Sequence, residues 1–335
     1  MSRYLVSGGA GYVGSHVVLA LLDAGHEVVV VDDLSTGHRD AVPPAATFIQ
    51  ANLSERHRLA EIFAAWKFDA VFHLAALSLV GESMQQPMRY CRENLANGMN
   101  LAEAAVTAGC LRFVLSSTAA LFGVPKVTPI AEDAPTTPVN PYGLSKLMME
   151  QALAWAESAN GLHSAALRYF NAAGADPLGR AGEDHEPETH LIPRAILATL
   201  GRLPPLHVFG TDYDTPDGTA IRDYVHVADL AAAHIAVLPR LERGSVRYNI
   251  GNGAGHSVHE VIAAIERVSG RKVPYENGPR RAGDPPALVA SSKLLRAETG
   301  WTPRHAALDD IVRTAWNWHL AHPQGYATHE ALAAD

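Results

Sequence analysis

The feature that most constrains the fold of this chain is a glycine-rich turn near its N-terminus. It reads Gly8-Gly9-Ala10-Gly11-Tyr12-Val13-Gly14 and lies between the apolar run 4–7 and the helical run 15–22. Gly25 is placed to end that helix, because glycine readily adopts positive φ. The β-branched run 28–31 that follows is typical of a strand buried on both faces. The segment therefore predicts one β-α-β unit.

The spacing of these glycines predicts a dinucleotide site. Gly9, Gly11 and Gly14 match the fingerprint of such turns, which requires a strand before it and a helix after it. Glycine permits the tight turn and the close approach of a pyrophosphate, which the free N–H groups of the helix then hold. Asp32 ends the second strand, where a carboxylate binds ribose hydroxyls and repels a 2′-phosphate. The pattern favours NAD over NADP, and a glycine turn without a ligand is the alternative interpretation.

Apolar runs with the character of strands recur along the first half of the chain, at 70–74, 113–117 and 164–169. Helical stretches at 94–108 and 144–159 lie between them. This alternation predicts an α/β fold with a Rossmann-type, doubly wound parallel sheet covered by helices on both faces. Ligands of such sheets bind beyond the carboxyl ends of the strands.

The composition of the chain changes after residue 171. Glycine, proline and acidic residues crowd into three loops, and these are 174–187, 210–218 and 274–286. Helical stretches separate the loops, so we interpret them as ordered loops that close over a site. We expect an NAD-binding domain over 1–171 and a second, smaller α/β substrate-binding domain over 172–335, with 223–238 as a candidate segment for return to the first domain.

Charge and cysteine content exclude several classes of protein. The 335 residues include 27 Lys and Arg against 35 Asp and Glu, a formal net charge of −8, and only 2 Cys. An acidic balance argues against a nucleic-acid partner, and so few cysteines argue against a disulfide scaffold. We find no targeting signal and no apolar run of the ~18 residues that cross a membrane. The expectation is a cytoplasmic enzyme or sensor without a membrane or nucleic-acid partner.

The central chemical motif is Tyr142-Gly143-Leu144-Ser145-Lys146. Residues i and i+4 share a helix face, so the phenol and the ammonium can address one cofactor. A neighbouring cation lowers the pKa of a tyrosine and suits it to act as a general base. The strand end 116–118 adds hydroxyls to the same edge of the sheet. An ordinary pair on a helix face is the alternative.

Together these motifs resemble the extended short-chain dehydrogenase/reductase family, most closely its nucleotide-sugar 4-epimerases. The resemblance runs from Tyr4 to about Tyr326. The segments that carry it are 8–16, 73–76, 80–83, 141–146, 167–171, 217–219, 222–230 and 280–284.

The resemblance implies interconversion of UDP-galactose and UDP-glucose through a transient 4-keto sugar, with tightly bound NAD. Tyr142 as phenolate takes the proton of the C4 hydroxyl while NAD takes the C4 hydride. Thr118 bonds the C4 oxygen and relays the proton, and Lys146 holds the nicotinamide ribose and tunes Tyr142. The 4-keto sugar then turns over in the site and receives the hydride on its other face.

The resemblance also implies the residues of the two binding sites. Those for the cofactor are Gly8, Gly11, Tyr12, Val13, Gly14, Asp32, Asp33, Asn52, Leu53, Leu74, Ala75, Ala76, Asn94, Ser116, Tyr142, Lys146 and Tyr169. Those for the substrate are Thr118, Tyr142, Asn171, His190, Leu191, Phe209, Arg222, Arg281, Asp284 and Leu288. In this second set, the residues that contact the diphosphate are Asn171, Arg222 and Arg281. Phe209 lies against uracil, and Asp284 accepts from the uridine ribose. Surface or structural ion pairs are the alternative for the two arginines.

Several positions depart from the family pattern. Thr118 replaces a common serine, Ser78 an expected lysine, Asn52 an expected aspartate, and His190 a frequent asparagine. Leu288 is intermediate between the aromatic residues that exclude N-acetyl sugars and the small residues that admit them, so the use of N-acetylated sugars stays open.

The motifs leave two other functions open. A 4,6-dehydratase shares the first hydride step, but its pattern has acidic residues where this chain has Ala119 and Ala120. A non-catalytic NAD-binding regulator usually lacks the tyrosine or the lysine, and both are intact here. The histidines show no spacing typical of metal ligands, so no metal is expected. The family also suggests a homodimer through the helices at 94–108 and 144–159.

Overall fold

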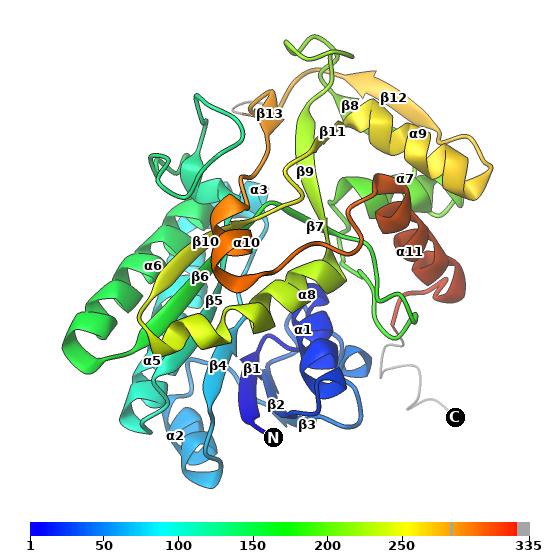
Figure 1. Cartoon of the computed structure of the whole chain (residues 1–335). Coiled ribbons are helices and arrows are strands. Elements are labelled where there is room, and N and C mark those ends of the chain that lie inside the picture. The colour runs from blue at the N-terminus through cyan, green and yellow to red at the C-terminus, as the bar shows by residue number, and fades with distance from the viewer. Residues whose placement is uncertain (282–283, 327–335) are drawn as a thin grey trace, which may run out of the picture.

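A seven-stranded parallel sheet organises the larger of two regions in the computed structural model, which describes residues 1–281 and 284–326 (Figure 1). Ala282 and Gly283, two residues of the motif at 280–284, lie outside the described residues. The strand order is β10-β6-β5-β4-β1-β2-β3, which winds outward in both directions from β1 as predicted. The strands are β1 Arg3–Ser7, β2 Glu27–Asp32, β3 Thr47–Gln50, β4 Ala70–His73, β5 Arg112–Thr118, β6 His163–Tyr169 and β10 Val246–Ile250.

Helices cover both faces of this sheet because its strands alternate buried side chains between two apolar cores. In β2, Val28 and Val30 belong to one core, whereas Val29 and Val31 belong to the other. Helices α1 Tyr12–Asp23, α8 Val227–Ala236 and α10 Lys293–Thr299 pack into the first core. The second core holds α2 Arg56–Ala65, α5 Asn97–Thr107 and α6 Pro141–Asn160. Two short helices, α3 Val80–Gln85 and α4 Pro87–Tyr90, and a π-helical segment, Cys91–Ala96, lead into α5.

The boundaries of α6 illustrate how local sequence places the Tyr142–Lys146 motif. The side chain of Asn140 caps the helix by accepting from Gly143 N at 2.8 Å, and Pro141 occupies the first turn, where no N–H is needed. Gly161 ends the helix in the left-handed region at φ 74°. Tyr142 and Lys146 therefore lie in the first two turns, near the carboxyl ends of the strands.

The smaller region holds two further sheets. In a four-stranded sheet, β9 Ile221–His226 pairs with β7 Asn171–Ala173, β11 Gly255–Ser257 and β13 Ala287–Leu288. A second pair joins β8 Leu206–Phe209 to β12 Tyr275–Gly278. Three helices, α7 Leu191–Thr199, α9 Val258–Ser269 and α11 Leu308–Ala321, contribute to a third apolar core. This region has α/β character, as expected.

The chain crosses between the two regions more than once. Within the predicted returning segment 223–238, α8 packs beside α1 on the large sheet, whereas most of β9 stays in the smaller sheet. Strand β10 lies far beyond the predicted division at residue 171, yet it forms the edge of the large sheet next to β6. The domain division stays a prediction. Among the described residues, none of the helices combines the length and apolar character needed to cross a membrane.

Candidate active site

The carboxyl ends of the large sheet open into one cavity of about 1180 Å³, which residues of the smaller region also line. Twenty-two of the predicted site residues line it, which brings together segments distant in sequence. They are Gly8, Gly11, Tyr12, Val13, Gly14, Asp32, Asp33, Asn52, Leu53, Leu74, Ala75, Ala76, Ser116, Thr118, Tyr142, Lys146, Tyr169, Asn171, His190, Leu191, Arg222 and Leu288. The predicted residues outside this lining are Asn94, Phe209, Arg281 and Asp284.

The glycine turn is a cradle that side chains would fill. A Cβ atom on Gly8, whose φ is 76°, would lie 2.3 Å from Ala75 N, and one on Gly14 would lie 1.9 Å from Gly8 O. Gly11 begins α1 without a side-chain cap, so the first N–H groups of this helix face the cavity edge without such a partner. A cradle of free donors at a helix N-terminus fits a pyrophosphate.

Asp32 lies at the end of β2 and is 8% exposed. Its carboxylate accepts from Ala10 N at 3.0 Å and from Leu34 N at 2.9 Å, while burial raises the pKa of the group. Asn52 donates to Asp33 at 2.6 Å on the neighbouring strand end. These contacts fix an acidic edge beside the cradle, and the set of residues fits NAD.

Tyr142, Thr118 and Lys146 meet on the other side of the cavity. Burial raises the pKa of Tyr142, and the neighbouring Thr118 hydroxyl opposes that rise. Lys146 is 3% exposed and donates to Ser116 O at 2.8 Å, and burial lowers its pKa to about 7. Burial therefore dominates the pKa of Tyr142 in this structure, and its predicted lowering by Lys146 stays a prediction.

A buried ion pair connects α6 to the large sheet. Glu150 lies one turn beyond Lys146 and pairs with Arg168 of β6 at 2.7 Å, with both side chains at most 4% exposed. Ser117 of β5 donates to the same carboxylate at 2.5 Å. The pair and this bond join α6 to β5 and β6 and so fix the position of the Tyr142–Lys146 motif.

The predicted substrate residues form a second group around β9. Arg222 of β9 pairs with Asp284 and also donates to Ile221 O at 2.6 Å. Leu288 of β13 is the register partner of Arg222, and the guanidinium of Arg281 lies 4.0 Å from the centre of the Phe209 ring. Phe209, Arg281 and Asp284 therefore lie beside the cavity lining, joined to it through Arg222.

Asn94 has a positioning role in the structure. Its amide bonds both backbone groups of Leu77, at 2.8 and 2.9 Å, and donates to Ser145 Oγ at 3.1 Å. These bonds tie the loop after β4, which lines the cavity, to α6. Direct contact of Asn94 with the cofactor stays a prediction.

The sequence motifs did not indicate one group on the loop before α7, of whose four residues three line the cavity. Glu183, His185 and Glu188 converge there with His190, which had been predicted only as a substrate residue. The signal was present as three glutamates, one aspartate and two histidines within eight residues. It did not match a familiar spacing of metal ligands, because the loop folds the four residues together without a helix or strand between them.

Comparison with known proteins adds to this geometry. The model of the NAD dependent epimerase/dehydratase family matches residues 4–251. The chain belongs to this family. That result confirms the resemblance derived from the motifs.

Members of the epimerase/dehydratase family are similar to this chain over nearly all its length. The UDP-glucose 4-epimerase of Azospirillum brasilense is 52% identical over 94% of this chain and 91% of its own. A crystal structure of a UDP-glucose 4-epimerase has a TM-score of 0.95 at 46% identity, covering 97% of this chain and all of that one. The enzyme from Bifidobacterium longum, in complex with NAD⁺ and UDP, has a TM-score of 0.92 at 36% identity, with 97% and 100% covered.

Proposed function

We propose that this member of the family is a UDP-glucose 4-epimerase that interconverts UDP-galactose and UDP-glucose with tightly held NAD. The observation that carries the proposal is the convergence of Tyr142, Thr118 and Lys146 on the cavity that the glycine cradle also lines. The named activity of the similar proteins supports it over nearly the whole chain.

The residues of this chain carry out the proton transfer at the C4 oxygen of the sugar. NAD, when bound, accepts the hydride from C4 and later returns it to the opposite face. Tyr142 takes the hydroxyl proton, and Thr118, whose hydroxyl lies near the phenol, relays it. A phenolate on Tyr142 and an ammonium on Lys146 stabilise each other, which opposes the effect of burial on both groups.

We also propose that the sugar turns over within the cavity while the nucleotide end stays bound. Arg222 and Asn171 line the cavity and supply donors for a diphosphate, while Arg281 lies next to Arg222's partner Asp284 in the group beside it. Arginine binds phosphate bidentately, so the nucleotide end is held firmly while the 4-keto sugar keeps rotational freedom. The diphosphate contacts stay part of the proposal.

The test is to incubate the purified protein with UDP-galactose, without added NAD, and to separate the nucleotide sugars. We expect UDP-glucose to accumulate to an equilibrium that the reverse reaction, started from UDP-glucose, also reaches. Absence of conversion by protein shown to contain NAD contradicts the proposal.

The same experiment separates the two alternatives. Dehydration yields a 4-keto-6-deoxy sugar, whose formation needs acid and base groups after Thr118. Ala119 and Ala120 occupy those positions and line the cavity, and neither side chain can donate or accept a proton. A non-catalytic regulator would bind NAD and leave both sugars unchanged.

Activity on N-acetylated sugars is a second part of the proposal. Leu288 lines the cavity beside Arg222, and a leucine leaves more room there than an aromatic ring. We expect slower but measurable conversion of UDP-N-acetylglucosamine. Its complete absence under conditions that convert UDP-galactose removes this part only.

We also propose a homodimer through α5 and α6. Exposed apolar side chains gather on α5, α6 and the short helices before them, including Met84, Met88, Met99 and Trp155, which are 48–77% exposed. Light scattering of Trp155→Glu against the unchanged protein tests it, with a shift to monomer expected. Cytoplasmic location stays a prediction.

A further inference from the structure

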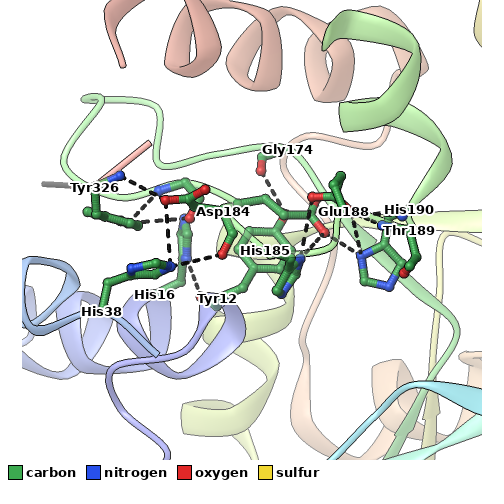
Figure 2. A network of polar contacts seen from close by, with 12 residues as sticks. Tyr12, His16, His38, Gly174, Asp184, His185, Glu188, Thr189, His190 and Tyr326 are labelled. Carbon is green, nitrogen blue, oxygen red and sulfur yellow. Dashed lines mark hydrogen bonds and ion pairs between the residues drawn. The ribbon is translucent and has the colours of Figure 1, made fainter. Parts of the chain in front are cut away.

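Four side chains of the loop before α7 converge on one point at the edge of the cavity. They are Glu183, His185, Glu188 and His190, and we call them the loop cluster. One ligand-type atom from each lies within 4.8 Å of the other three. Figure 2 shows His185, Glu188 and His190 pointing toward one another beside Tyr12.

The separations within the loop cluster approach those of a tetrahedral metal site. His185 Nδ1 lies 3.4 Å from Glu183 Oε1 and 3.5 Å from Glu188 Oε2. His190 Nδ1 lies 3.9 Å from Glu188 Oε1 and in direct contact with Glu183. Nitrogen and oxygen ligands about 2.0–2.1 Å from a zinc ion are about 3.3 Å from each other in a tetrahedron.

Burial makes the two carboxylates of the loop cluster costly without a counter-charge. Each glutamate side chain is 5% exposed. Within the described ranges 1–281 and 284–326, the structure records no lysine or arginine paired with either carboxylate. A divalent cation carries the charge that neutralises two carboxylates, while two neutral imidazoles complete its coordination.

The surroundings hold the ligands in place, as second-shell contacts do at metal sites. Glu188 Oε1 accepts from Thr189 N at 2.7 Å and from His190 N at 2.8 Å. On the other side of the loop, Asp184 accepts from Tyr326 N at 2.8 Å and from His38 through its carbonyl at 3.2 Å, as Figure 2 shows. The bonds to Glu188 orient that ligand before the ion arrives, and the bonds to Asp184 fix the loop between Glu183 and His185.

We propose that the loop cluster binds one zinc ion through His185, His190, Glu183 and Glu188 as a structural site that fixes this loop. Two imidazole nitrogens disfavour magnesium and calcium, which take oxygen ligands. Four protein ligands close the coordination sphere, which is the mark of a structural site rather than a catalytic one.

The competing interpretation is an ionic cluster without metal. In it both histidines carry protons, and the carboxylates raise the pKa of His185 to about 10 despite its burial. Zinc displaces those protons, because a ligating imidazole must be neutral. Metal binding, rather than pH, therefore decides between the two interpretations.

One consequence links the zinc site to catalysis, and it rests on the proposed function. Zinc on Nδ1 of His190 leaves the ring proton on Nε2, so the exposed part of the ring becomes a fixed donor. His190 and the next residue, Leu191, line the cavity. We expect loss of zinc to raise KM for UDP-galactose more than it lowers kcat.

The test uses the full chain, purified without a polyhistidine tag and dialysed against a chelator. Zinc chloride is titrated into it by calorimetry, and the metal content is measured by mass spectrometry. We expect one zinc per chain, a melting temperature that rises with zinc concentration, and a visible absorption band typical of tetrahedral coordination when Co²⁺ replaces zinc.

His185→Asn is the decisive variant, because asparagine keeps an N–H donor for the carboxylates but does not replace the imidazole as a zinc ligand. We expect its zinc Kd to rise at least about 100-fold, since even second-shell changes cost 10–100-fold. His207→Asn changes an exposed histidine outside the loop cluster and serves as the matched control.

Equal zinc binding by the two variants and the unchanged protein overturns the proposal, as does binding of less than one equivalent by correctly folded protein. Circular dichroism and the NAD content of His185→Asn show whether this variant is folded. If it is folded, a loss of zinc binding is not caused by unfolding. The zinc titration needs no sugar, so its failure is distinct from failure of the epimerase assay.

Discussion

The cofactor side and the substrate side of the cavity are built in different ways. On the cofactor side, the positions that matter are fixed by backbone: Gly14 lies against the carbonyl of Gly8, and Asp32 bonds two backbone N–H groups. On the substrate side, side chains contact one another, as in the ion pair of Arg222 with Asp284 and the guanidinium of Arg281 over the Phe209 ring.

This difference teaches how each side receives its ligand. A cradle shaped by backbone contacts is preorganised, so a tightly held cofactor gains affinity from the ordering already present. For the proposed diphosphate and ribose to bind, the paired side chains must exchange partners, which suits a substrate that binds and leaves many times. We therefore expect changes on the two sides to affect different quantities.

The largest effect is expected from Tyr142→Phe, at the point where the two sides meet. Removal of the hydroxyl removes the general base, so kcat should fall by roughly 10³-fold while NAD stays bound. Rates of UDP-galactose conversion and the NAD content of the purified protein are the measurements. Tyr275→Phe, at a 44% exposed tyrosine on β12, is the control. A near-normal rate for Tyr142→Phe contradicts its role as base.

The variant Gly14→Ala is designed to disrupt only the cofactor side of the cavity. The added Cβ would lie 1.9 Å from a backbone carbonyl, which no side-chain rotation relieves, so the cradle must open. We expect NAD to dissociate about 100-fold faster, the scale of loss that a misplacement of about 1 Å produces. Gly81→Ala is the matched control, because a Cβ there meets nothing within 4 Å. Similar NAD retention by both variants would show that the turn does not hold the cofactor.

The stability of the cofactor side should depend on pH through its buried histidines. Burial lowers the pKa of His234 of α8 to about 4 and that of His73 of β4 to about 3. The unfolded chain binds protons near pH 6.5 and the folded chain does not, so stability is complete above that pH and falls on acidification. As the pH falls from 7 to 5, each of these histidines should lower the free energy of unfolding by about 2 kcal/mol.

Urea unfolding of His234→Leu at pH 7 and pH 5 measures this dependence. The variant should lose about 2 kcal/mol less than the unchanged protein over that range, whatever its stability at pH 7. The same change at His57, an exposed residue of α2, is the control for a histidine lost from the surface. An unaltered pH dependence in His234→Leu refutes the assignment.

The smallest effect is expected on the substrate side, from Arg281→Ala. Loss of one charged hydrogen bond to a phosphate costs about 1.5 kcal/mol, or roughly a tenfold rise in KM for UDP-galactose. NAD content and kcat should change little. Arg280→Ala removes the neighbouring arginine, which pairs with Asp212 at 2.7 Å, and serves as the control. An equal rise in KM for both variants would show that the effect comes from the loss of a positive charge and not from a specific contact of Arg281.

Prediction from sequence was accurate where a few neighbouring residues decide the structure. The turn at 8–14, the valines of β2 and the Tyr142–Lys146 face of α6 all lie as the local patterns indicate. The electrostatics of that face did not follow from spacing. Lys146 is buried and bonded to Ser116 O, so burial rather than a neighbouring charge governs its pKa.

By itself the sequence determined the alternation of strands and helices in the first half of the chain, the glycine turn and the shared helix face of Tyr142 and Lys146. Each of these depends on backbone conformation or on spacing within one element, which neighbouring residues control. Only the tertiary structure decided that β10 returns to the large sheet, that Arg222 pairs with Asp284, and that the loop cluster converges. Those contacts join residues through loops and distant strands, where no short-range pattern specifies which side chains meet.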